Sequence, residues 1–139
     1  MERYTLTYDD FKNICYDLYV LVCNNKYDGI LCILRGGFFL SYFMSEHTGL
    51  PIKYIEVFSY DNELQVNPSI GIKSELEQGN YLLCDDIYDT GSTIKLIKKE
   101  YPNINFDIMT LLTKKRIKNL IYSKFIKKDV WVDFFWELL

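Results

Sequence analysis

The stretch Tyr81-Leu82-Leu83-Cys84-Asp85-Asp86-Ile87-Tyr88-Asp89-Thr90-Gly91-Ser92-Thr93 decides the fold of this chain of 139 residues. Its first four residues are apolar, as is typical of a buried strand, and the segment Thr93–Glu100 that follows is predicted to be helical. A strand that leads directly into a helix indicates an α/β unit. Small hydroxyl residues around a glycine at a helix start are suited to a phosphate, because hydroxyls and backbone N–H groups can both donate to it.

Three carboxylates, Asp85, Asp86 and Asp89, stand in the middle of this stretch. Beside a phosphate site they would repel the anion unless they bind something else, and sugar hydroxyls or a magnesium ion would serve. A sugar phosphate would satisfy the hydroxyl-rich turn and the carboxylates together. The alternative is a strand-end turn that only caps the next helix, but three adjacent carboxylates without a ligand would cost stability.

The rest of the chain alternates between strand and helix patterns. Thr7 and Asp10 resemble a capping box in front of an apolar-periodic stretch. The predicted helices and strands are a helix at 8–23, a strand at 30–34, a helix at 38–47, a strand at 52–58, the strand at 81–84, the helix at 93–100 and a strand at 106–113. This order predicts one α/β domain over residues 1–139, with a mainly parallel twisted sheet flanked by helices.

Three further segments are less regular. The polar stretch 59–79 is predicted to be a loop that acts as an active-site lid. A basic stretch, Lys114–Lys128, leads to a terminal apolar segment, Val130–Leu138. Ligands of such sheets bind beyond the carboxyl ends of the strands, and both unusual loops, Arg35–Gly37 and Asp85–Thr93, are expected there.

Composition excludes several classes of protein. A net charge of −3 argues against nucleic acid as the main partner. The four cysteines form no CxxC pair, so we expect neither a zinc site nor a disulfide framework, and Cys32 and Cys84 are predicted to be core residues. No leader is recognisable and no apolar run approaches the ~18 residues of a membrane span, so a soluble cytoplasmic protein is expected.

The central stretch resembles the phosphoribosyl pyrophosphate signature of the type I phosphoribosyltransferases, and the chain looks closest to the bacterial 6-oxopurine (xanthine-guanine and hypoxanthine) enzymes. The resemblance implies that Asp85 and Asp86 bind the ribose hydroxyls and hold Mg²⁺, partly through water. It also implies that Asp89 lies near the base as the catalytic acid–base group. The residues implied to wrap the 5′-phosphate are Thr90, Gly91, Ser92 and Thr93.

Two more segments support the resemblance. Arg35-Gly36-Gly37 is similar to the family's pyrophosphate loop, which often contains a cis peptide, here expected near Leu34–Arg35. Arginine supplies a charged fork for an anion, although such a tripeptide alone is more often a turn. Ser59-Tyr60 resembles the start of the mobile catalytic loop of the 6-oxopurine enzymes, with an ordinary exposed loop as the alternative.

The last third of the chain bears on the base, which the resemblance places under a small C-terminal hood. Lys114 looks like the lysine that faces the exocyclic oxygen of a 6-oxopurine, and the adjacent Lys115 is the alternative. Trp131 resembles the aromatic residue that stacks on the purine, and the alternative is that it is a core or interface tryptophan. The backbone at Val132 resembles the group that contacts the 2-position of the purine. The sequence ends at Leu139, where bacterial xanthine-guanine enzymes typically continue.

The resemblance thus implies a purine phosphoribosyltransferase of nucleotide salvage, with phosphoribosyl pyrophosphate and a purine base as substrates. The aromatic content of 17% leads us to expect a homodimer or higher homo-oligomer. Two alternatives remain open. One is a regulatory protein of the same fold that binds phosphoribosyl pyrophosphate and acts on RNA through Lys114–Lys128. The other is a phosphoribosyltransferase for a different base.

Overall fold

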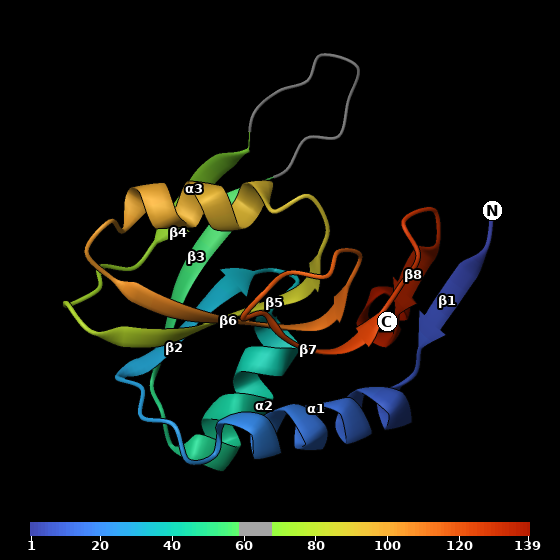
Figure 1. The fold of residues 1–139 in the computed structure, drawn as a ribbon, viewed down its shortest axis with the longest axis horizontal. Coiled ribbons are helices and arrows are strands. Elements are labelled where there is room, and N and C mark those ends of the chain that lie inside the picture. Colours follow the sequence, from blue (N-terminus) through green and yellow to red (C-terminus); the bar gives the residue numbers. More distant parts are fainter. Residues whose placement is uncertain (59–67) are drawn as a thin grey trace.

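The structure, a computed structural model, describes residues 1–58 and 68–139. Its centre is a twisted sheet with the strand order β4-β3-β2-β5-β6-β7 (Figure 1). β4 pairs antiparallel with β3, and the remaining neighbours in the sheet pair in parallel. The strands are β2 (Gly29–Leu34), β3 (Ile52–Phe58), β4 (Ser69–Lys73), β5 (Asn80–Tyr88), β6 (Asn105–Thr113) and β7 (Ile121–Phe125).

Helices cover both faces of this sheet. The helices α1 (Tyr8–Val22) and α2 (Phe38–Thr48) lie on one face, and α3 (Ser92–Glu100) lies on the other (Figure 1). Each face has its own buried cluster. One includes Leu18, Leu40 and Leu82, and the other includes Leu83 and Ile97. The predicted α/β class with a mainly parallel sheet flanked by helices is confirmed.

Local sequence signals set several boundaries as predicted. The hydroxyl of Thr7 accepts a hydrogen bond from the backbone N–H of Asp10 at 3.1 Å and caps α1. α2 ends at Gly49, whose φ of 76° is favourable for glycine. The predicted cis peptide is present between Leu34 and Arg35. Cys32 and Cys84 are buried in the core, as expected.

A second, two-stranded sheet joins the two ends of the chain. β1 (Arg3–Leu6) pairs in parallel with β8 (Trp131–Phe134), and a 3₁₀ helix, η1 (Phe135–Leu138), follows. We call β1, β8 and η1 the hood. The hood packs on the helices through η1, since the Trp136 ring stacks on Phe39 of α2 with 5.1 Å between ring centroids. The hood was predicted from the C-terminal segment alone, and the structure adds an N-terminal strand.

The structure differs from the predicted pattern of helices and strands at four places, each of which is a correction. The strand β4 lies inside the stretch 59–79 that was predicted to be a loop, and β7 lies inside the basic stretch. β1 was not predicted at all. These are short strands at sheet edges or in the hood, and their residues are mostly exposed or half-buried, so they lack the continuous apolar run that identifies a central strand.

The fourth correction concerns Asp85 and Asp86, which were predicted to lie in a loop. They lie within β5, which continues to Tyr88 because its neighbour β6 continues beside it: Ile87 pairs with Leu112 and Tyr88 with Thr113. The pairing with β6 therefore outweighs the local preference of two aspartates for a turn. Among the described residues, no helix has the length and apolar character needed to cross a membrane.

Candidate active site

Two loops meet at one edge of the main sheet. β2 and β5 are adjacent parallel strands, so the residues that follow Leu34 and Tyr88 emerge on the same side. This is also where the strand order reverses, because the chain moves outward in one direction from β2 to β3 and in the other from β5 to β6. Such a reversal point is where open α/β sheets bind their ligands.

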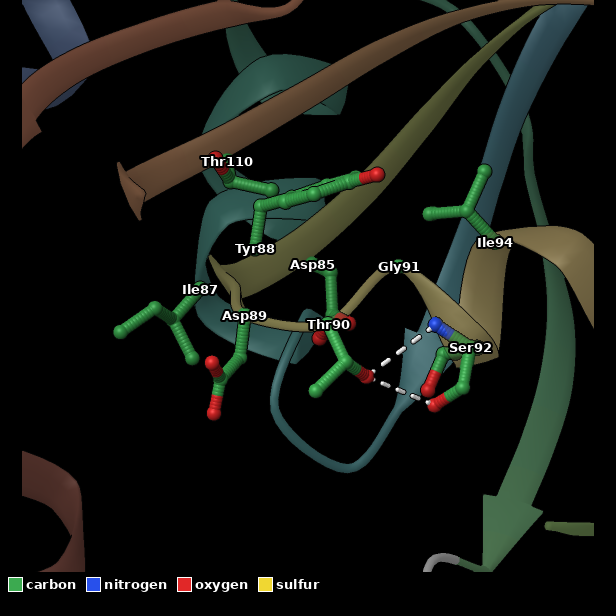
Figure 2. Close-up of a pocket in the computed structure, with 10 residues that line it drawn as sticks. Asp85, Ile87, Tyr88, Asp89, Thr90, Gly91, Ser92, Ile94 and Thr110 are labelled. Carbon is green, nitrogen blue, oxygen red and sulfur yellow. Dashed lines mark hydrogen bonds between the residues drawn. The ribbon is translucent and has the colours of Figure 1, made fainter. Parts of the chain in front are cut away.

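The first cavity at this edge has a volume of about 390 Å³ (Figure 2). It brings together six of the predicted site residues, from the end of β5 and the start of α3. Its lining consists of Asp85, Ile87, Tyr88, Asp89, Thr90, Gly91, Ser92, Thr93, Ile94 and Thr110.

The turn at the floor of this cavity has the form of an anion cradle. Gly91 has a φ of 85°, which few other residues adopt without strain, and this conformation lets α3 begin immediately at Ser92. The Thr90 hydroxyl donates to the Ser92 hydroxyl at 3.1 Å and accepts from the Ser92 N–H at 3.3 Å (Figure 2). The following amides of α3 have no partner within the helix, so hydroxyls and N–H groups are available for an anion.

Asp85 and Asp86 form a half-buried carboxylate pair on β5. Asp85 accepts from the Asp86 N–H at 2.9 Å, and Asp86 accepts from the Ile87 N–H at 2.7 Å. Burial, with the negative charge of Asp86 added, raises the pKa of Asp85 well above its ordinary value, and burial also raises the pKa of Asp86. Within the described chain neither forms an ion pair, so both carboxylates could receive a cation or donor hydroxyls.

These two side chains fit a magnesium ion by their chemistry, since carboxylate oxygens are its preferred protein ligands. Among the described residues there is no group of three or more His, Cys, Asp and Glu side chains arranged to hold a metal. A magnesium ion at this pair would therefore take its other ligands from water and a bound phosphate compound, as is usual for this metal.

Asp89 is exposed at the rim of the cavity. Its carboxylate points away from the turn formed by Thr90 and Ser92, on the side of Ile87 (Figure 2). It is thus free to meet a group that lies beside, rather than inside, the anion cradle.

A second cavity, of about 730 Å³, holds the other predicted loop. Arg35 and Gly36 line it together with Asp86, and the hood contributes Trp136 and Glu137. Burial, followed by the negative charges of Asp86 and Asp133, raises the pKa of Glu137. The two cavities share the carboxylate pair, since Asp85 lines the first and Asp86 the second.

Gly37 acts through close packing in this loop. Its N–H already donates to the Ile33 carbonyl at 2.7 Å, and a side chain at this position would collide with the Cys84 carbonyl of β5. A side chain at Gly36 would run into the Asp86 carboxylate. The glycines therefore hold Arg35 close to the end of β5.

The residues predicted to bind the base line neither cavity. The Lys114 ammonium donates to the Lys128 carbonyl at 3.0 Å, and the Lys114 N–H donates to the Tyr88 carbonyl at 2.8 Å. Trp131 is 52% exposed on β8, and Val132 packs beside the core. Lys114 thus connects the end of β5 to the chain that enters the hood.

Ser59 and Tyr60, the predicted start of the mobile catalytic loop, lie outside the described residues.

The linings of the two cavities include residues that sequence reasoning missed, among them Tyr88, Trp136 and Glu137. Tyr88 lies over the turn with its hydroxyl against Gly91, and Trp136 and Glu137 reach the second cavity from η1. The signal for Tyr88 was its place inside the central stretch. The sequence shows Trp136 and Glu137 only as part of a terminal apolar segment, because their approach to the second cavity depends on the packing of the hood.

Comparison with known proteins agrees with this arrangement. Residues 6–138 match the family described as "Phosphoribosyl transferase domain". The purine phosphoribosyltransferase of Pyrococcus horikoshii has a similar structure, with a TM-score of 0.82 and 25% identity, over 98% of this chain and 95% of that chain. The Helicobacter pylori xanthine-guanine-hypoxanthine phosphoribosyltransferase gives a TM-score of 0.74 and 26% identity, over 99% and 95%. A Staphylococcus aureus hypoxanthine phosphoribosyltransferase shares the fold, with a TM-score of 0.68 and 24% identity, over 86% and 74%.

Proposed function

The chain belongs to the phosphoribosyl transferase domain family, and from this premise we propose that it transfers ribose 5-phosphate from phosphoribosyl pyrophosphate to a 6-oxopurine base and releases pyrophosphate. It is an enzyme of the glycosyltransferase class with the fold of the purine phosphoribosyltransferases. The proposed base is guanine, xanthine or hypoxanthine, which would make the reaction a step of purine salvage. The observation that carries the proposal is the shared edge at which carboxylates, anion cradle and Arg35 loop line two adjoining cavities.

The proposed binding of the sugar phosphate follows from the donor and acceptor types. Asp85 and Asp86 are acceptors for the ribose hydroxyls, and the 5′-phosphate occupies the cradle formed by Thr90–Thr93. Magnesium at Asp85 and Asp86, partly through water, would supply positive charge that offsets the charge of the departing pyrophosphate.

Arg35 and the Gly36 amide are the proposed donors to the pyrophosphate group, and Gly37 keeps them close to β5. As the bond from the anomeric carbon to pyrophosphate breaks, a ring nitrogen of the base forms the new bond to that carbon. Asp89 is the proposed acceptor of the proton that this nitrogen, or its partner in the imidazole ring, gives up.

Recognition of the base falls to the hood and the end of β6. Trp131 is proposed to stack on the purine, Lys114 to face its 6-oxo group and the Val132 backbone to face its 2-position. For this, the Lys114 ammonium must exchange its bond to the Lys128 carbonyl for one to the base. The proposed assembly is a homodimer or higher homo-oligomer formed by a single-domain chain.

A panel of bases tests the proposal. Guanine, xanthine, hypoxanthine, adenine, uracil and orotate are each incubated with phosphoribosyl pyrophosphate, magnesium and the protein, and the nucleotide and pyrophosphate formed are measured. We expect turnover with one or more of the first three. Turnover with adenine or a pyrimidine alone would identify an enzyme for a different base.

The RNA-binding alternative rests on Lys114–Lys128, with seven basic residues and no acidic one. Two of these already contact aromatic rings: Arg116 lies 4.4 Å from the Phe125 ring centroid, and Lys124 lies 4.2 Å from that of Tyr4. Titration with RNA at physiological salt separates the two functions. Tight, specific binding without base turnover would favour the regulator.

A further inference from the structure

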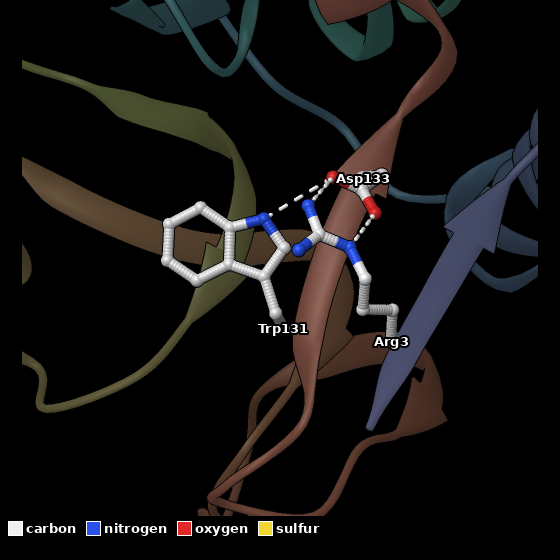
Figure 3. A network of polar contacts seen from close by, with 3 residues as sticks. All are labelled: Arg3, Trp131 and Asp133. Atoms are coloured by element: carbon white, nitrogen blue, oxygen red, sulfur yellow. Dashed lines mark hydrogen bonds and ion pairs between the residues drawn. The ribbon is translucent and has the colours of Figure 1, made fainter. Parts of the chain in front are cut away.

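A network of three side chains spans the hood (Figure 3). The Arg3 guanidinium donates from Nε to Asp133 Oδ2 at 2.9 Å and from Nη2 to Oδ1 at 2.9 Å. The Trp131 indole Nε1 donates to the same Oδ1 at 3.2 Å. One carboxylate therefore holds both the arginine and the indole.

The pairing of β1 with β8 creates this network from residues 130 positions apart. Arg3 is the register partner of Trp131, and the Trp131 N–H donates to the Glu2 carbonyl at 2.9 Å. Trp131 and Asp133 are two positions apart on one strand, so their side chains project from the same face. The strand geometry therefore brings the guanidinium, the carboxylate and the indole to one side of the hood.

Arg3 also acts electrostatically on Asp133. Its hydrogen bonds lower the pKa of Asp133 and keep that carboxylate ionised.

The exposure of the three side chains indicates that the network orients the indole more than it stabilises the fold. The Arg3 side chain is 59% exposed and that of Asp133 is 20% exposed, and ion pairs of this kind add little to stability. Trp131 is 52% exposed among the described residues, so a large part of it is accessible to a ligand. A free indole would turn about its side-chain bonds, whereas an indole held at Nε1 keeps one ring plane.

We propose that Arg3 is a positioning residue: through Asp133 it fixes the Trp131 indole in the plane that receives the purine base. The proposal rests on the function proposed above, in which Trp131 stacks on the base. It gives the N-terminal strand a part in base affinity, although Arg3 itself need not touch the substrate.

The kinetic test compares variants at both ends of the network. Arg3→Ala is expected to raise KM for the base roughly 3–10-fold, a stacking-sized loss, and to leave KM for phosphoribosyl pyrophosphate and kcat within about twofold. Arg3→Lys keeps the charge but not the two-pronged contact, so it should fall between Arg3→Ala and the wild type. Asp133→Asn keeps an oxygen acceptor for the indole and should be milder than Asp133→Ala.

The control is Lys73→Ala, which removes the ion pair of Lys73 with Glu100 at 3.1 Å, an exposed pair outside the hood. It should leave both KM values unchanged. A spectroscopic test follows the ring itself: in a Trp136→Phe background Trp131 is the single tryptophan, since the chain has two. Adding Arg3→Ala should then lower the fluorescence anisotropy of Trp131 in the free protein.

The outcomes separate this proposal from the function on which it rests. An unchanged KM for the base in Arg3→Ala, with normal wild-type turnover, would overturn the positioning role alone. Equal losses for both substrates, accompanied by a lower Tm, would overturn it in favour of a structural role. No turnover of any base by the wild type would overturn the proposed function and, with it, this role.

Discussion

At the scale of single residues, Asp89 differs from the other two aspartates of the central stretch. Asp85 and Asp86 are half-buried and accept backbone N–H groups, whereas Asp89 is exposed at the cavity rim with its carboxylate turned away from the anion cradle. This separation fits two different tasks. The pair can hold the sugar, and the rim carboxylate can exchange a proton with the base.

The first prediction concerns Asp89→Asn. The amide keeps the size of the side chain but cannot accept a proton, so kcat should fall about 10²–10³-fold, the usual scale of a general acid–base contribution. The Kd of phosphoribosyl pyrophosphate with magnesium, measured by calorimetry, should change less than about threefold. Unchanged turnover would remove Asp89 from proton transfer, and an equal loss of sugar-phosphate affinity would give it a binding role instead.

The second prediction concerns the carboxylate whose pKa is raised most clearly by burial, Asp85. A raised pKa in the folded state means that the folded protein binds the Asp85 proton more tightly than the unfolded chain does. Stability is therefore lost as pH rises from about 4, the ordinary value for aspartate, through the raised value. Asp85→Asn has no such loss, so its Tm should exceed that of the wild type by roughly 2–5 °C at pH 7.

The difference in Tm between Asp85→Asn and the wild type should shrink toward pH 4, where the wild-type carboxyl is protonated as well. Affinity for phosphoribosyl pyrophosphate should fall in the same variant, because an acceptor of the ribose hydroxyls is weakened. The exposed Asp129→Asn is the matched control and should change neither quantity. A lower Tm for Asp85→Asn at neutral pH would contradict the account of the buried pair.

At the scale of the elements, α2 has a glycine at each end, and the two serve different purposes. Gly37 lies at the N-terminal end, packed against the Cys84 and Ile33 carbonyls, and nothing lies within 4 Å of a side chain built at Gly49. Gly49 is needed for its φ of 76° alone. One glycine therefore fixes the distance between a loop and β5, and the other only ends a helix.

The third prediction uses this contrast. Gly37→Ala must push the Arg35 loop away from β5, because both neighbouring atoms belong to the backbone and cannot turn aside. We expect kcat/KM for phosphoribosyl pyrophosphate to fall at least about 10-fold, because even a small displacement of a binding group can reduce the rate by that much. Gly49→Ala should lower stability by about 1 kcal/mol and leave kcat/KM unchanged. Equal kinetic effects of the two changes would show that the loop does not need this contact.

The elements also show what the sequence can predict. The central stretch, the Arg35 loop and most of the helices and the central strands were predictable because caps, glycines and apolar runs act within a few residues of one another. The extension of β5 to Tyr88 was not, since it depends on pairing with β6. The approach of Trp136 and Glu137 to the second cavity depends on packing against Phe39, and the contact of Arg3 with Asp133 joins the two ends of the chain. No local pattern carries such information.

At the scale of the whole molecule, α1 and α2 carry large apolar side chains that are exposed among the described residues. Tyr16 and Val20 of α1 and Phe38 and Tyr42 of α2 are between 41% and 68% exposed. The two helices are joined at this surface, since the Tyr16 ring lies 5.0 Å from the Phe43 ring, centroid to centroid. Large aromatic side chains gathered in this way are typical of surfaces that bind another protein.

The fourth prediction is that this surface joins two copies of the chain. Sedimentation velocity at micromolar concentration should give about twice the 16.6 kDa of one chain. Tyr42→Glu places a charge in the surface and should shift the protein to the monomer, since a charge buried in an interface without a partner costs several kcal/mol. Ile72→Glu, at a position of β4 that is 65% exposed, should leave the sedimenting mass unchanged.

Because Phe38 also lines the second cavity, the monomeric Tyr42→Glu variant should lose affinity for the pyrophosphate end of the substrate as well. A wild-type protein that sediments as one chain, or a Tyr42→Glu variant that stays dimeric, would place subunit contact elsewhere or remove it.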